Sequence, residues 1–492
     1  MYVAVDVGTS SIKTALADAR GYVVKEIATP IELTTPEAGA AEHDLERIAR
    51  LVAESIRRIV SGFEDRVEAL SFSNYLHGVS LLGEDCRAIT GVLTHLDTRA
   101  GSVQASLDEL GRVLYERTGC PPLFVYPLAK LLWFRSRELL RRARGVSFVK
   151  DYVIYRLAGL RVIDFGTASG TGMLNIRRLR WDDLSLELAG LSEEKLPELS
   201  EGARVIDYVS IPELGLRRVA IVPGSFDGAL QNIGYGVYGS RAVLNLGSTA
   251  VVRVLKREVV LDRDPRMRFF CYYAADGYTA VGAASNNGMT ALEWIRQNLL
   301  GGASWSEVMS EVEKASPCGG GVYVLPFLAG ERFPFRDPYL RLTIAGLGIQ
   351  HSRSSIARAS FEGVSFILKA ILDALSENGV PVSELHCGGS GCSLKGFVEV
   401  VSSVLGRPVV IYSEKLARLA SSLGAVLVAM RALGHVSDLS KNLGEVVGTE
   451  RAERVEPKEV ACLEYEKCFK VFMSYLEILS EQYKRVATAT TR

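Results

Sequence analysis

The chain carries one pattern twice: an apolar strand, a short turn of glycine and hydroxyl residues, and a second apolar strand. The first copy spans residues 2–17 with its turn at 8–11, and the second spans 242–255 with its turn at 247–249. Alternating small and β-branched residues around a glycine turn predict a β-hairpin. One such hairpin at the start of each half predicts an internal duplication, with the two turns facing each other across a cleft.

The length supports the same division. A chain of 492 residues with 48% hydrophobic and 23% charged residues exceeds the usual size of a single core and has apolar material for two. We therefore expect two α/β domains, residues 1–245 and 246–492, joined by short crossings that can act as a hinge. Helical periodicity is visible in several segments. These are residues 45–59, 128–142, 289–299, 354–375, 396–404, 420–433 and 462–484.

Charge and composition argue against several partner classes. Lys plus Arg and Asp plus Glu both total 57, so no net field attracts nucleic acid or an anionic membrane. The N-terminus lacks the features of a secretory signal, and no apolar run reaches the ~20 residues of a membrane span. The eight cysteines show no metal-ligand spacing, so we expect mostly free thiols in a reducing cytoplasm, with a disulfide between some pair left open.

The two turns are candidates for holding phosphates. Glycine-rich turns can offer backbone N–H groups to phosphate oxygens, and Asp6 at the preceding strand end could hold Mg²⁺ through water. An ordinary hairpin turn is the alternative for the first copy taken alone. The candidate phosphate-binding residues are Gly8, Thr9, Ser10, Ser11, Lys13, Gly247, Ser248 and Thr249.

Asp227 is the candidate catalytic acid-base residue. It follows a short apolar strand and precedes the small-residue run Gly228-Ala229, so it lies at a strand-to-helix junction where a carboxylate can point into a cleft. There it could take a proton from an attacking hydroxyl. A helix N-cap aspartate is the simpler alternative, and Asp227 by itself favours it.

A glycine-rich loop in the second half is a candidate adenosine site. Gly388, Gly389 and Ser390 follow a strand-like run, and glycines there would let a flat ring approach the backbone. The loop lacks the spacing of the Walker A and dinucleotide motifs, and a plain strand-to-helix turn is the alternative.

Two segments of the first half offer candidate sugar contacts. Leu76 and His77 end a strand-like run at a cleft edge, although single histidines are more often structural. Asp97 and Arg99 could bind sugar hydroxyls or could equally form a local ion pair.

Taken in order, these segments resemble the FGGY carbohydrate kinase family. The resemblance runs from the first hairpin to about residue 430. It covers the DxGTxxxK run from Asp6, His77-Gly78, Asp97 to Arg99, Lys130, Lys150-Asp151, Asp164, Asp227, the LGST turn, residues 328–332, the GGSG loop and residues 421–425. It implies a duplicated actin-like, ribonuclease-H-like fold whose halves flank a cleft.

The resemblance also implies roles. ATP and Mg²⁺ would lie in the cleft, with adenine against residues 388–390 and the triphosphate between the two turns. The sugar would lie near Leu76, His77 and Asp227, and Asp227 would be the base. Residues 225–234, 285–288 and 127–130 are most similar to the gluconokinase branch, which implies gluconate as the acceptor.

Other activities stay open beside gluconate phosphorylation. Xylulose, ribulose and glycerol are alternative acceptors, and Leu76, where relatives commonly have methionine, leaves the acceptor undecided. A non-kinase actin-like ATPase is the alternative class. The sequence does not fix the oligomeric state, and a homodimer is compatible with it.

Overall fold

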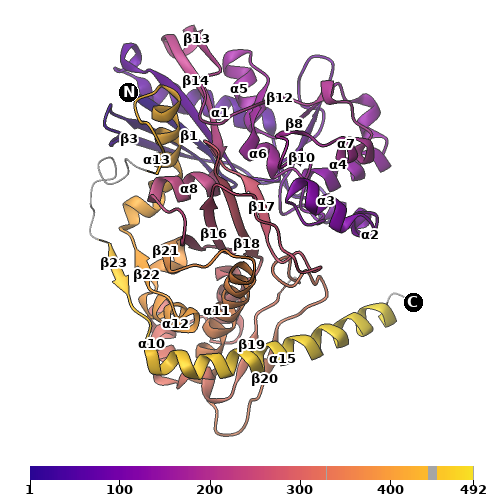
Figure 1. The fold of residues 1–492 in the computed structure, drawn as a ribbon, viewed down its shortest axis with the longest axis vertical. Coiled ribbons are helices and arrows are strands. Elements are labelled where there is room, and N and C mark those ends of the chain that lie inside the picture. Colours follow the sequence, from indigo (N-terminus) through magenta and orange to yellow (C-terminus); the bar gives the residue numbers. More distant parts are fainter. Residues whose placement is uncertain (329, 441–451, 491–492) are drawn as a thin grey trace.

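The computed structural model describes residues 1–328, 330–440 and 452–490. Each half is built on one β-sheet, and Figure 1 shows the first half above the second. The sheet of the first half has six strands in the order β13-β14-β5-β1-β2-β3. These strands are β1 (Tyr2–Val7), β2 (Ser11–Ala17), β3 (Val23–Pro30), β5 (Ala69–Asn74), β13 (Asp207–Ile211) and β14 (Leu216–Phe226).

The sheet of the second half has seven strands in the order β17-β18-β16-β15-β21-β22-β23. They are β15 (Arg241–Leu246), β16 (Ala250–Lys256), β17 (Phe270–Tyr273), β18 (Thr279–Ser285), β21 (Glu384–Gly388), β22 (Val409–Ile411) and β23 (Glu453–Val455). Shorter strands form two-stranded ribbons outside both sheets. They are β4 (Glu42–His43), β6 (Ser80–Leu82), β7 (Val92–Leu93), β8 (Gly145–Ser147), β9 (Val162–Asp164), β10 (Leu174–Asn175), β11 (Arg180–Trp181), β12 (Glu198–Ser200), β19 (Tyr323–Leu325) and β20 (Thr343–Ala345).

The two sheets share one connectivity, which confirms the predicted duplication. In the first, β1 pairs antiparallel with β2, β2 antiparallel with β3, and β1 parallel with β5, which is parallel with β14. In the second, β15, β16, β18, β21 and β22 repeat these pairings in the same order. The predicted hairpins therefore occupy corresponding places inside both sheets. Each hairpin has one parallel and one antiparallel neighbour, and both turns reach the same cleft.

Helices cover the sheets and fill the connections. Those of the first half are α1 (Leu45–Val60), α2 (Gln104–Asp108), α3 (Gly111–Thr118), α4 (Pro127–Ser136), α5 (Lys150–Ala158), α6 (Phe165–Ser169), α7 (Asp183–Ala189) and α8 (Asp227–Tyr235). Those of the second half are α9 (Met289–Asn298), α10 (Trp305–Lys314), α11 (Arg353–Glu377), α12 (Lys395–Leu405), α13 (Glu414–Ala432) and α15 (Glu459–Thr490). All seven periodic segments contain helix, although α4 ends at Ser136 and α13 begins six residues before the predicted start.

The halves meet where α8 and α13 cross. Figure 1 shows α13, coloured as part of the second half, beside the strands of the first half, and it packs against β1, β5 and β14. A Cβ on Gly234 of α8 would collide with the Ala420 carbonyl, and one on Gly424 of α13 would collide with the Leu230 carbonyl. Glycine is needed at both positions because the two helix backbones touch.

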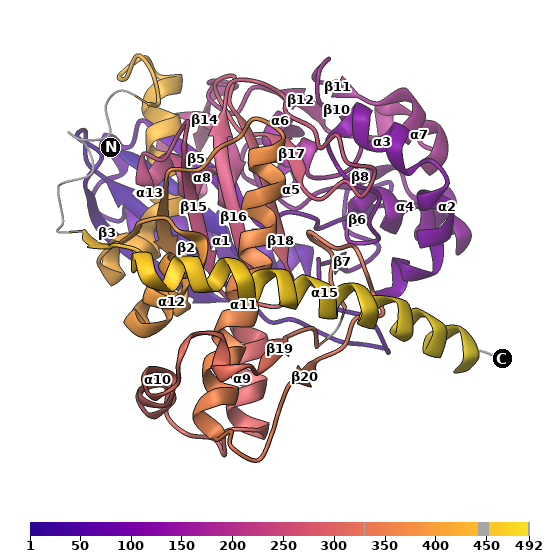
Figure 2. The same cartoon turned by 60° about the horizontal axis from the view of Figure 1, so that its bottom comes forward.

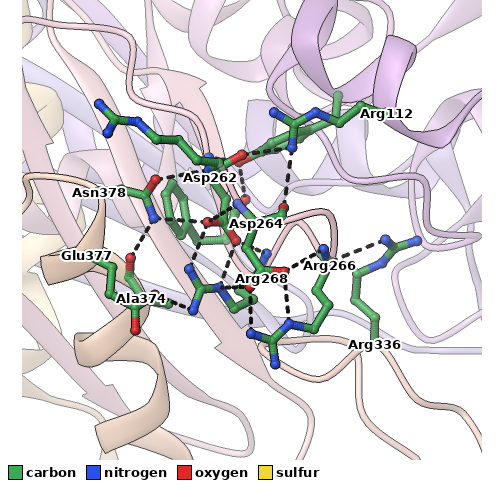
Figure 3. A network of polar contacts seen from close by, with 12 residues as sticks. Arg112, Asp262, Asp264, Arg266, Arg268, Arg336, Ala374, Glu377 and Asn378 are labelled. Atoms are coloured by element: carbon green, nitrogen blue, oxygen red, sulfur yellow. Dashed lines mark hydrogen bonds and ion pairs between the residues drawn. The ribbon is translucent and has the colours of Figure 1, made fainter.

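A polar network braces the halves on the side of α3 (Figure 3). Arg268 makes two bonds of 2.9 Å to the buried Asp262 carboxylate and an ion pair of 2.7 Å with Glu377 at the end of α11. Arg112 of α3 donates to the Asp262 carbonyl at 2.9 Å. Such a paired and hydrogen-bonded cluster holds a fixed geometry between α3 and the second half.

The structure pairs four of the eight cysteines, which corrects the expectation of mostly free thiols. Cys318 is bonded to Cys468 of α15, with Cα atoms 6.0 Å apart, and Cys387 is bonded to Cys392 across the loop that follows β21. Sequence spacing gave no signal for the first pair because 150 residues separate its members. Figure 2 shows α15 lying across α11 and α12 and extending beyond them at its C-terminal end. No helix within the described residues is long and apolar enough to cross a membrane.

Candidate active site

A cleft of about 420 Å³ opens between the two halves, and it collects most of the side chains that the sequence singled out. The predicted site residues that line it come from both hairpins, from the end of β5 and from the start of α8. They are Asp6, Gly8, Thr9, Ser10, Ser11, Lys13, Leu76, His77, Asp227, Ser248 and Thr249. Two turns and one acid that are distant in sequence thus face a single opening.

Asp227 is the first residue of α8, not its N-cap, which is Phe226. Its carboxylate accepts the backbone N–H of Gly228 at 2.6 Å. Burial raises the pKa of Asp227 to about 6; the nearby Asp6 carboxylate raises it further, whereas the Arg253 guanidinium opposes the shift. A carboxyl with a pKa near neutrality is suited to accept a proton from a hydroxyl and release it again.

Arg253 is the cation that opposes the raised pKa of Asp227. It lies on β16, and its guanidinium donates to Asn232 at 2.8 Å and to Gln231 at 3.1 Å. A Cβ on Gly228 would collide with this guanidinium, so the glycine at the start of α8 leaves room for the cation. Sequence reasoning missed Arg253, yet a charged residue inside the apolar run Ala250 to Leu255 is a readable signal of a buried functional contact.

We expect a pH profile that reports this carboxyl. A base works only when deprotonated, so a pKa raised to about 6 predicts that kcat/KM falls as the pH drops through about 6. Arg253→Met removes a cation that favours the ionised form, so the midpoint should move to higher pH, whereas Arg253→Lys should keep it near the wild-type value. Steady-state kinetics from pH 4.5 to 8.5 would measure it. A midpoint unmoved by Arg253→Met would contradict the assignment.

The two turns are held in shape by their own backbones. In the first, the Gly8 N–H bonds the Ser11 carbonyl at 3.0 Å. In the second, the Gly247 N–H bonds the Thr249 carbonyl at 3.0 Å, and the start of α9 supports the turn through the Met289 N–H, 2.8 Å from the Gly247 carbonyl. Gly247 is not among the residues that line the cleft, so it shapes the turn while Ser248 and Thr249 face the opening.

The glycine loop after β21 lies next to the second turn but does not line this cleft. A Cβ on Gly388 would come within 2.5 Å of the Gln231 amide, and one on Gly389 would come within 2.7 Å of the Leu246 carbonyl. Gly389 and Ser390 are exposed. The loop therefore forms an open surface beside the cleft, and glycine is required where it approaches β15.

Asp6 is the second carboxylate of the cleft. It accepts a hydrogen bond from Ser73 at 2.7 Å and faces Lys13 across the hairpin. Burial raises its pKa, while Ser73, Lys13 and Lys150 oppose the shift. Within the described residues no three His, Cys, Asp or Glu side chains come together as a metal cluster. Two cleft carboxylates fit Mg²⁺ as it is usually held beside phosphates, by one or two carboxylates.

Leu76 and His77 also line the cleft, and both lie against Gly170. The Nδ1 atom of His77 is 2.9 Å from the Gly170 carbonyl, which can only accept, so Nδ1 carries the proton and Nε2 is free to accept. His77 has a φ of 73°, a left-handed conformation that is uncommon outside glycine. Lys130 fixes this strained position, because its ammonium donates to the His77 carbonyl at 2.6 Å and the Thr94 carbonyl at 2.8 Å.

Asp97 and Arg99 do not line the cleft. They form an ion pair of 2.6 Å, and Arg99 extends it to Glu37 at 2.7 Å and to Glu42. Asp97 is fully buried and also accepts the Ala41 N–H. The local ion pair that the sequence left open is therefore what the structure contains. His95 of the same segment lines the cleft instead, a residue that sequence reasoning did not weigh.

A buried ion pair lies behind Asp227. The Lys150 ammonium is 2.5 Å from the Asp164 carboxylate and donates to the Ser225 carbonyl at 3.0 Å, two residues before Asp227. Asp164 also accepts the Thr167 N–H at 2.8 Å at the start of α6. The pair thus joins α5, α6 and the end of β14 at the point from which Asp227 projects.

Two duplicated halves that enclose a cleft lined by two glycine-hydroxyl turns and an acid define a phosphotransferase with an actin-like fold. Sequence profiles for the N-terminal and C-terminal domains of the FGGY family of carbohydrate kinases match residues 1–234 and 242–433. The chain belongs to the FGGY family of carbohydrate kinases. The enzyme is thus a carbohydrate kinase, and the non-kinase ATPase that the sequence left open is not supported.

Known relatives agree with this assignment and divide between two activities. A gluconokinase from Bacillus subtilis is 28% identical over 98% of this chain and 97% of its own length. The crystal structure of a gluconate kinase from Lactobacillus acidophilus has a TM-score of 0.92 at 27% identity, covering 99% of both chains. A ligand-bound xylulose kinase from the same organism has the same TM-score and identity, covering 99% of this chain and 100% of its own. Overall similarity alone therefore does not select the acceptor.

Proposed function

We propose that this enzyme transfers the γ-phosphoryl group of ATP to a hydroxyl of gluconate, with Asp227 as the base. The observation that carries the proposal is that one cleft is lined by Asp227, by residues of both glycine-hydroxyl turns, and by Leu76 and His77. Phosphoryl transfer needs the acceptor oxygen in line and charge compensation around the phosphates. The resemblance of residues 225–234, 285–288 and 127–130 to the gluconokinase branch favours gluconate over the other acceptors.

In this proposal each half of the chain binds mainly one of the two substrates. Residues 1–245 form the sugar side, and residues 246–492 form the nucleotide side. The first turn, Lys13 and the second turn would hold the triphosphate with backbone N–H and hydroxyl donors. The exposed loop of Gly388, Gly389 and Ser390 would take the adenosine. Asp227 would orient the acceptor hydroxyl and remove its proton.

Mg²⁺ fits the two carboxylates of the cleft. Asp6 would hold the ion through water, and the ion would supply charge neutralisation on the phosphates. Asp6 accepts its Ser73 hydrogen bond through one oxygen, Oδ1, which leaves its other oxygen for a metal-bound water.

An ADP-release assay with gluconate, D-xylulose, D-ribulose and glycerol tests the proposed function. We expect gluconate to have the highest kcat/KM, by about tenfold or more, because a pocket that hydrogen-bonds one polar end rejects analogues that lack it. A preference for D-xylulose would replace gluconate with the alternative acceptor. Release of ADP that no sugar, acid or polyol stimulates would overturn the proposed function itself.

A further inference from the structure

The cations of the cleft fall into two groups. Lys13 and Arg253 act on the pKa of Asp227, so they lie at the end where the base and Asp6 meet. Arg332 also lines the cleft, and together with the buried Lys130, which does not line it, Arg332 adds to burial in lowering the pKa values of His77 and His95, so Arg332 lies near these two histidines. The carboxylates among the lining residues are Asp6 and Asp227, both in the first group. The lining near the two histidines thus contains the Arg332 cation and no carboxylate, and the acid that acts on Arg332 is the buried Glu331 outside the lining.

Arg332 is the strongest sign that this end receives an anion. Its Nε donates to the Ala284 carbonyl at 2.6 Å, and its remaining nitrogens have no hydrogen bond or ion pair with any described residue. Burial lowers its pKa. A guanidinium that faces a cleft with only its Nε bonded has donors available to a ligand, and a bidentate anion is the ligand that its fork of donors matches.

The neighbouring Glu331 does not neutralise Arg332 through a direct contact. Its Oε1 accepts the backbone N–H groups of Asn286 at 3.1 Å and Arg332 at 2.8 Å, and its Oε2 accepts from Ser285 and from Asn287. The carboxylate is thus occupied in shaping the loop at residues 285–287. The guanidinium of Arg332 is left to face the cleft.

His95 supplies a second donor at the same end. No described residue forms a hydrogen bond with its ring, although the ring lines the cleft. Burial, with help from Arg332 and Lys130, lowers its pKa to about 3, so the imidazole is neutral and has one N–H to donate. Lys130 fixes the segment through the adjacent Thr94 carbonyl.

We infer that Arg332 and His95 bind the carboxylate of the sugar acid and so select aldonates over neutral sugars. The inference rests on the proposed function and adds its specificity-determining residues. The γ-phosphate of ATP is the other anion expected in the cleft. Because it must reach the hydroxyl held by Asp227, it would lie beside Asp227 and the two turns, where Lys13 and Arg253 are the nearby cations. Arg332 groups with His77, His95, Tyr126 and Tyr272 at the sugar end.

Binding of gluconate and glucitol to the protein without nucleotide tests this inference. Glucitol has a CH₂OH group where gluconate has a carboxylate. The ratio of their dissociation constants therefore measures how much the carboxylate contributes to binding. We expect calorimetry to show gluconate bound about 10- to 100-fold more tightly by the wild type, the range of hydrogen bonds to a charged partner. Arg332→Met and His95→Asn should each remove most of this ratio, whereas glucitol affinity should change less than about threefold.

Arg336→Met is the matched control. Arg336 is four residues further along and partly buried, but it contacts the Arg266 and Pro122 carbonyls instead of the cleft. It should leave the ratio unchanged, and ATP affinity should survive in all three variants. A ratio retained in both Arg332→Met and His95→Asn would overturn the inference while gluconate turnover by the wild type still upheld the proposed function. Loss of ATP affinity in Arg332→Met would assign Arg332 to the nucleotide and also overturn it.

Discussion

Asp227→Ala should lower kcat by about 10²- to 10⁴-fold, the range that a positioned general base contributes. The carboxyl is partly buried at the start of α8, faces the cleft, and has a pKa raised to about 6 by burial. Nucleotide binding should survive, because the two turns are closed by their own backbone hydrogen bonds and do not depend on Asp227. Single-turnover kinetics and a fluorescent-nucleotide titration would separate the two effects.

Two further variants make this prediction specific. Asp227→Asn keeps the shape of the side chain and its bond to the Gly228 N–H but cannot take a proton, so it should be nearly as inactive as Asp227→Ala. Asp183→Ala removes an exposed acid that pairs only with Arg180 among the described residues, and it should retain full activity. Turnover by Asp227→Asn within about tenfold of wild type would remove Asp227 from the role of base.

Local sequence patterns predicted the centre of the fold because the forces that set them are local. In the hairpins at residues 2–17 and 242–255, apolar residues alternate around turns that close through their own N–H groups. Each hairpin therefore contains both of the strands that pair, and a short segment of sequence is enough to predict the pairing. The helices α1 and α11 follow from apolar periodicity in the same way. Their repetition was enough to predict two halves around a cleft.

The contacts that the sequence did not reveal are long-range. The start of α13 was missed because charges interrupt its first residues, Glu414 to Leu419, although the cap at Ser413 is a local signal; only its close contact with α8 at Gly424 is long-range. Cys318 and Cys468 have no spacing that marks them as partners. Within the site, Arg332 and His95 sat in segments already singled out, but only the folded chain shows which side chain of a segment faces the cleft.

Lys150→Met should be among the most destabilising single changes, by about 3–5 kcal/mol, because it leaves a carboxylate uncompensated in the interior. Lys150 and Asp164 are 1% and 0% exposed, and no solvent can replace the lost ammonium. The same change frees the Ser225 carbonyl two residues before Asp227, so kcat should fall as well. Urea unfolding would measure the stability, and Lys25→Met, which removes an exposed lysine bonded to the Arg58 carbonyl, should change it little.

The double variant Lys150→Met/Asp164→Asn decides between lost charge pairing and lost packing. Removing the charge of Asp164 as well leaves a neutral amide that can still accept the Thr167 N–H at the start of α6. If the cost of Lys150→Met is an unpaired buried charge, the double variant should recover about half or more of the lost stability, since buried pairs replaced together are often nearly neutral. Recovered stability without recovered kcat would show that the Lys150–Ser225 bond positions Asp227. A double variant as unstable as the sum of both single variants would mean that the two residues act independently.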